Sequence, residues 1–128
     1  VGVVFVVNVQ CAFGFVVNPS GYAGAYELSG VSGAVAVQGL GVAFLMWNVT
    51  YPLVIWKPNA HRTLFGVVLV QQAVGLIGES AIASQLPAGH EVLAAGIGRF
   101  IAFDAFGLVI MGIAFALLMW TTHLSERN

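Results

Sequence analysis

Four long apolar segments make up most of this chain, and clusters of Pro, Gly, Asn and charged residues separate them. The segments cover about residues 1–18, 31–52, 63–84 and 92–120. A helix needs about 20 apolar residues to cross the hydrocarbon core of a bilayer, and these segments approach or exceed that length. They do not alternate apolar with polar residues as the strands of a membrane barrel do. The segments therefore predict membrane-spanning helices.

The scarcity of charge indicates the same solvent. Of the 128 residues, 59% are hydrophobic and 7% are charged, whereas soluble domains have about 25% charged residues. Four Lys and Arg with five Asp and Glu are too few to cover a soluble domain of this length. The formal net charge is -1, and the Lys and Arg residues do not cluster into a basic surface, which argues against a nucleic-acid partner. We predict a single-domain, all-α integral membrane protein whose first partner is the lipid bilayer.

Prolines and basic residues predict how the chain crosses the membrane. Pro19 closes the first segment, and Pro52 ends or kinks the second close to Tyr51. Lys57 and Arg62 connect the second segment to the third, and Arg127 follows the fourth. The other two connections, NPSGYAGAYELSG and QLPAGHE, contain no Lys or Arg. By the positive-inside rule we expect an up-down-up-down four-helix bundle with both termini cytoplasmic, in the cytoplasmic (inner) membrane of a bacterium.

Six polar or charged side chains within the predicted spans form the candidate site. They are Asn8, Gln38, Gln72, Glu79, Arg99 and Asp104. A helix rises about 1.5 Å per residue, which puts one half of the set near the outer surface and the other half near the midplane. Gln38, Glu79 and Arg99 share the outer level. Because charges in hydrocarbon pair with one another, we expect a buried polar cluster that holds the bundle together.

The pairing within this cluster can be predicted from helical angles. Gln72 and Glu79 lie within about 20° of one another around their helix, so both should face inward. We predict a buried ion pair between Glu79 and Arg99, because their depths match. Arg99 and Asp104 are separated by about 140° on the fourth helix and cannot share one narrow seam. We therefore expect Asp104 to bond to Asn8 or Gln72 instead.

Small residues at helical spacing predict faces for close helix packing. One stripe lies on the fourth segment and one on the second, and they consist of Ala94, Gly98, Ala102 and Ala105, and of Ala36, Gly39 and Ala43. Such stripes let helix backbones approach in a membrane. The sequence leaves open whether the packing is within one bundle or between protomers.

Motifs for enzyme chemistry are absent from the sequence. It contains no HExxH, Cys-x-x-Cys, G-x-S-x-G or P-loop pattern. The three histidines lie in or beside connections, which argues against a transmembrane haem. His90 and Glu91 are adjacent, but two adjacent ligands do not make a metal site. We predict no metal and no cofactor, and bound lipid is compatible with the apolar surface.

These features favour an accessory or structural subunit of a larger membrane complex. Its partners would be other membrane subunits or further copies of the chain. Two alternatives remain open. One is a membrane enzyme for a lipophilic substrate, with Glu79, Asp104 and Arg99 as candidate catalytic residues in carboxylate acid/base chemistry. The other is a small proton-coupled transporter that uses Glu79.

Overall fold

The computed structural model describes residues 1–126, with side chains as far as Leu124. Arg127, which contributed to the predicted orientation, lies outside the described residues. Across residues 1–126 the chain is helical without strands, which confirms the all-α prediction. The elements are α1 (Gly2–Val17), α2 (Pro19–Ala23), the 3-10 helix η1 (Gly24–Tyr26), α3 (Gly30–Asn48), α4 (Tyr51–Trp56), α5 (Arg62–Gln85) and α6 (Glu91–Glu126).

Three helical stretches are long and apolar enough to cross a membrane. They are Gly30–Trp56, Arg62–Gln85 and Glu91–Leu124. A fourth candidate consists of α1 together with α2 and η1, and it is bent by 110° between Val17 and Pro19. Since the 16 residues of α1 extend only about 24 Å, this first segment is a broken span or a re-entrant loop rather than one straight helix.

Prolines occupy the first turns of the helices that follow both breaks in the first half of the chain. Pro19 begins α2, where its missing N–H costs no helical hydrogen bond. Pro52 lies in the first turn of α4, so the predicted interruption near Tyr51 is present. A side chain satisfies one of the carbonyls at this second break, because Asn48 Nδ2 donates to the carbonyl oxygen of Phe44 over 2.8 Å.

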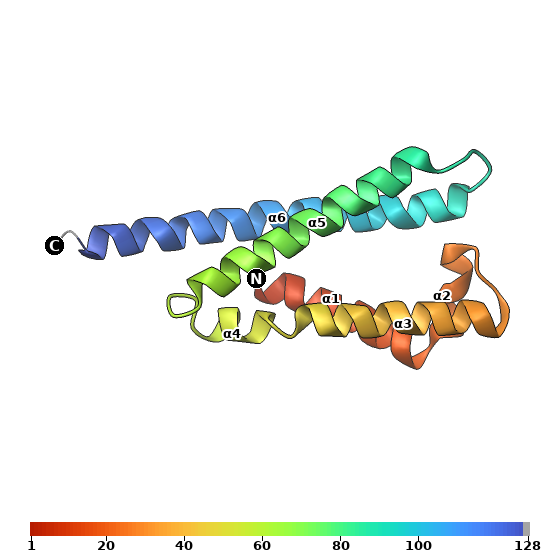
Figure 1. Ribbon diagram of the computed structural model, residues 1–128, viewed down its shortest axis with the longest axis horizontal. Helices are drawn as coiled ribbons and strands as arrows, with labels where there is room; N and C mark the ends of the chain where they lie inside the picture. Colours follow the sequence, from red (N-terminus) through yellow and green to blue (C-terminus); the bar gives the residue numbers. More distant parts are fainter. Residues whose placement is uncertain (127–128) are drawn as a thin grey trace.

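The helices form two pairs, shown in Figure 1 as two layers. In the first pair α1 packs along α3, and in the second α5 packs along α6. The two helices of the first pair approach closely at Gly41, where a Cβ atom would lie 2.8 Å from the carbonyl oxygen of Ala12 and 2.8 Å from Cβ of Phe15. A glycine is therefore needed at this crossing.

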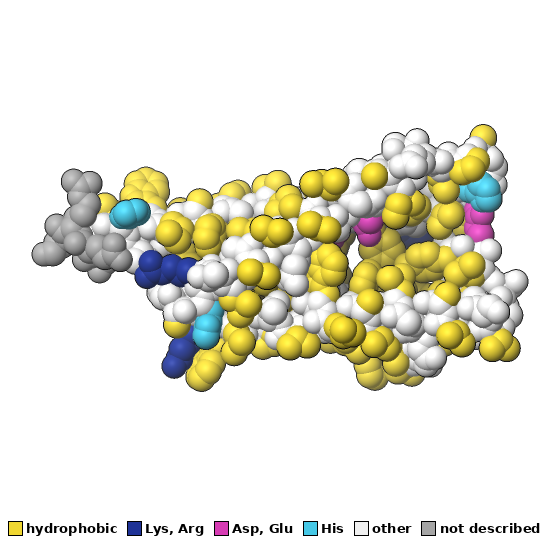
Figure 2. Space-filling model, in the orientation of Figure 1, with side chains coloured by type: hydrophobic (Ala, Val, Ile, Leu, Met, Phe, Trp, Pro, Cys, Tyr) yellow, Lys and Arg dark blue, Asp and Glu magenta, His cyan; other side chains and the backbone are white. Residues whose placement is uncertain are grey.

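The two pairs contact one another near both ends. Near α4, the buried side chains of Tyr51 and Val54 join a core with Phe65 of α5 and Met111 of α6. At the opposite end, shown on the right in Figure 1, η1 contacts the start of α6. Between these contacts the pairs separate, and Figure 2 shows a hollow there, with acidic side chains at its edges and part of a Lys or Arg side chain visible within it.

Candidate functional site

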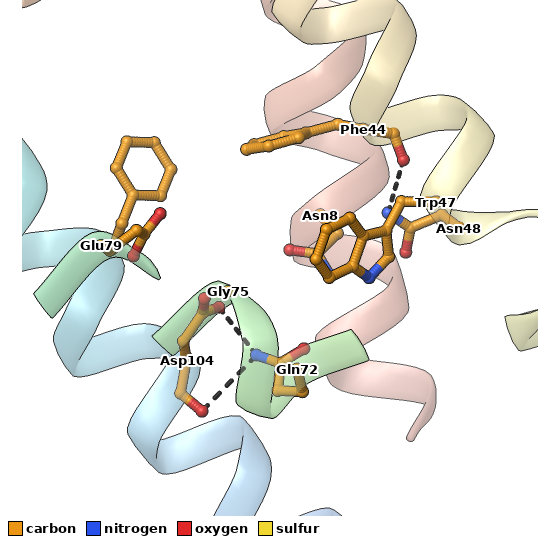
Figure 3. A pocket seen from close by; sticks show the side chains of 9 residues that line it. Asn8, Phe44, Trp47, Asn48, Gln72, Gly75, Glu79 and Asp104 are labelled. Carbon is orange, nitrogen blue, oxygen red and sulfur yellow. Dashed lines mark hydrogen bonds between the residues drawn. The ribbon is translucent and has the colours of Figure 1, made fainter. Parts of the chain in front are cut away.

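A cavity of about 110 Å³ lies between the two helix pairs. That volume has room for several water-sized groups. Figure 3 shows the side chains that line it, which come from α1, α3, α5 and α6. They are Asn8, Phe44, Trp47, Asn48, Gln72, Gly75, Glu79, Phe100 and Asp104. The lining thus combines two carboxylates, three amides and three aromatic rings.

Gln72 connects three helices beside this cavity through hydrogen bonds of its side-chain amide. It is 2% exposed, and its Nε2 donates to Asp104 Oδ1 over 2.7 Å. Its Oε1 accepts a hydrogen bond of 3.2 Å from the hydroxyl of Tyr51, which is fully buried. Of the two donors expected for Asp104, the structure places Gln72 beside it. The amide therefore links α4, α5 and α6 through side chains that are satisfied on both sides.

Two glycines make room for this hydrogen-bonded group. A Cβ atom on Gly75 would lie 2.8 Å from Asp104 Oδ2. A Cβ atom on Gly107 would lie 3.1 Å from Gln72 Nε2. Larger residues at either position would displace the polar side chains, so these glycines set the position of Asp104 at the cavity wall.

Glu79 and Asn48 bring acceptor atoms without donors to the cavity. Glu79 is half-buried, and its Oε2 is a buried atom with no hydrogen-bond partner. Asn48 is 3% exposed, and although its amide nitrogen is bonded, its Oδ1 has no partner. Buried oxygens of this kind are costly unless a donor is supplied. The cavity therefore favours an occupant that donates hydrogen bonds.

The expected ion pair between Glu79 and Arg99 is not formed. Among the side chains described, which extend to residue 124, the salt bridge present joins His90 to Glu27. These two residues lie in the connections at the end of the molecule where η1 contacts α6. Arg99 is exposed, and no charged residue in this part of the chain is fully buried. The reason is rotation about the helix axis: α6 turns Asp104 toward the cavity, and Arg99 lies about 140° away from it.

Gln38 also lies apart from the cavity. It is exposed on α3, and its Nε2 donates to the carbonyl oxygen of Val16 over 3.1 Å. That carbonyl belongs to the last turn of α1, where helices leave carbonyls without partners. Of the six predicted residues, the cavity includes Asn8, Gln72, Glu79 and Asp104, but neither Gln38 nor Arg99.

Several residues of this site were not predicted from the sequence. Asn48 and Tyr51 were overlooked because they lie at the end of the second predicted span. A signal was present, because a break near Pro52 frees carbonyls that a neighbouring amide can satisfy. The aromatic wall was not predicted either. In it, the rings of Phe44 and Phe100 meet edge to face, with centroids 6.2 Å apart.

No family model, curated protein or solved structure matches this chain. What the cavity can do follows from its own side chains. Two carboxylates beside amides and aromatic rings are able to bind a positively charged donor, or to accept a proton.

A second feature is the exposed face of α6. Ala94, Gly98 and Ala102 of the predicted small-residue stripe are exposed, whereas Ala105 is half-buried. Nothing lies within 4 Å of a Cβ atom built on Gly98. Arg99 is exposed beside this stripe. The stripe of α3 is exposed as well, so neither stripe is fully covered within the described chain.

Proposed function

We propose that this protein is an accessory or structural subunit of a larger membrane complex. In this proposal it has four segments running up-down-up-down in the inner membrane of a bacterium, with both termini cytoplasmic. The apolar helices fit a small multi-pass membrane protein. The partner is either another membrane subunit or a second copy of the chain.

Arg99 is the observation that carries this proposal. It lies about 12 Å along α6 from Glu91, is exposed, and has no acidic partner in the described chain. An arginine at the centre of a spanning helix costs about 2.5–3.5 kcal/mol. A carboxylate on a neighbouring subunit would offset that cost.

The small residues beside Arg99 support the same role. Gly98 and Ala102 would let the backbone of a second helix approach α6 closely, as small residues do in membrane interfaces. The combination of a small-residue surface with an unpaired charge favours a specific neighbour over lipid alone.

The test is co-purification of the tagged full chain from its membrane in mild detergent, followed by native mass spectrometry. We expect the wild type to run with a partner or as an oligomer. Gly98→Leu and Arg99→Leu should each reduce the bound fraction, whereas Ile77→Leu, on the exposed side of α5, should not. A wild type that is a stable monomer in its native membrane extract would contradict the proposal.

The enzyme and transporter alternatives depend on a different residue. Both would use the carboxylate of Glu79, so Glu79→Gln should abolish turnover of a lipophilic substrate or pH-dependent uptake into vesicles. The subunit role predicts instead that Glu79→Gln leaves the composition of the complex unchanged. Measuring both properties on the same variant separates these roles.

A further inference from the structure

We propose that the cavity between the helix pairs is a binding site for a small protonated amine. This proposal concerns the interior of the chain and does not depend on the subunit role assigned to α6. It is based on the sign of the hydrogen-bonding groups in the cavity, on the cavity's aromatic wall and on its size.

The two buried, unpartnered side-chain atoms of the cavity lining are both acceptors. Asn48 is almost fully buried, and its Oδ1 lacks a donor, as does Oε2 of Glu79. The carboxylate of Asp104 accepts from Gln72 through Oδ1, while its Oδ2 lies close to the wall at Gly75. An ammonium group has three N–H donors and no acceptor, so it complements these oxygens.

The charge of the cavity lining also favours a cation. The nine lining residues include two acids but no Lys, Arg or His. Arg99, the basic residue nearest in sequence to Asp104, is exposed and makes no salt bridge with Glu79. A compensating positive charge stabilises ionised carboxylates in a membrane interior. Because none of the nine lining residues supplies such a charge, a bound cation would do so.

Aromatic side chains form the wall opposite the carboxylates. Figure 3 shows Phe44 and Trp47 across the cavity from Glu79 and Asp104, and Phe100 also contributes to the lining. Aromatic faces attract organic cations and accommodate their alkyl groups. A hydrated inorganic ion would gain less from such a wall, so the lining favours an amine with a short alkyl chain. The volume of about 110 Å³ suits a ligand of a few heavy atoms.

The experiment is calorimetric titration of the full chain, purified in mild detergent, with ethylammonium, sodium, ethanol and acetate as probes. We expect saturable binding of ethylammonium at one site per chain, and no binding of ethanol or acetate. Glu79→Gln and Asp104→Asn should each weaken ethylammonium binding by about tenfold or more, since each removes a buried charge partner. Glu91→Gln, at the exposed start of α6, should leave it unchanged.

The variants preserve the fold in different ways. Asp104→Asn retains an oxygen that accepts from Gln72, and Glu79→Gln removes no hydrogen bond that the structure contains. If Asp104→Asn fails to fold, Glu79→Gln decides the outcome. Absence of saturable ethylammonium binding, equal binding of ethanol, or binding of sodium in preference to ethylammonium would overturn the proposal. Unchanged affinity in Glu79→Gln would also overturn it.

Discussion

The side-chain amide of Gln72 donates to Asp104 Oδ1 over 2.7 Å and so ties α5 to α6 beside the cavity. The same amide accepts from Tyr51, which extends the connection to α4. Because an amide has donors and an acceptor, one side chain serves a carboxylate on one side and a hydroxyl on the other. Gln72 therefore both positions a cavity carboxylate and joins the two helix pairs.

Replacing Gln72 with Leu should destabilise the protein. The change leaves Tyr51 and Asp104 without these partners, and each buried polar group left unpaired costs about 1–3 kcal/mol. The melting temperature in detergent should fall clearly below that of the wild type. Gln85→Leu is the matched control, because Gln85 is exposed and bonds only within its own helix. Equal melting temperatures for the two variants would contradict the role of Gln72.

Gly75 and Gly78 provide a matched test of how tightly Asp104 is held. Gly75→Ala would bring Cβ to 2.8 Å from Asp104 Oδ2, whereas a Cβ atom on Gly78 meets nothing within 4 Å. We expect Gly75→Ala to lower the melting temperature. Gly78→Ala should be neutral or raise it, because alanine favours a helix by up to about 1 kcal/mol over glycine. The prediction fails if both substitutions shift the melting temperature equally in the same direction.

A similar comparison on α3 tests the packing of α1. Gly41→Ala would place Cβ 2.8 Å from the backbone oxygen of Ala12, which cannot move without shifting α1. Gly39→Ala meets nothing within 4 Å. We expect Gly41→Ala to cost about 1–3 kcal/mol, as overpacking does, and Gly39→Ala to cost little. Denaturation in detergent with increasing SDS would measure the difference.

The contact between Glu27 and His90 should make stability depend on pH. The hydrogen bond from His90 lowers the pKa of Glu27 below its ordinary value. A carboxyl whose folded pKa is lowered stabilises the fold above its unfolded pKa, and this contribution disappears as the pH falls through the folded pKa. The wild type should therefore lose stability in acid, and Glu27→Gln should lose less over the same range. Identical acid transitions, measured by tryptophan fluorescence, would contradict this assignment.

The sequence predicted the helices well, because long apolar segments have few alternatives in hydrocarbon. It also placed Gln72 and Glu79 on one face, since seven residues return nearly to the same angle. The pairing of Glu79 with Arg99 failed for a related reason. Depth can be counted along a single helix, but the rotation of α6 relative to α5 depends on packing that neither helix encodes alone.

The position of Gln38 was unpredictable for another reason. Its partner is the carbonyl of Val16 in the last turn of α1, after which the chain bends by 110°. Pro19 signalled an end to the helix, but it did not give the direction of the following segment. The shape of the cavity likewise depends on how the two helix pairs diverge, which the sequence does not reveal. Its acidic residues were predicted because charge is scarce within the spans, whereas its aromatic residues were not distinguished from the many other apolar ones.

The division into two pairs has a consequence for how this protein can be assembled. Within each pair, most of the contacts are between its two helices. The segment from Lys57 to His61, which lies outside the helices, joins the two pairs. Helical hairpins of this kind can enter a bilayer during translation as separate units and associate afterwards. A chain split within that segment should therefore regain its native arrangement when both fragments are synthesised in the same cell.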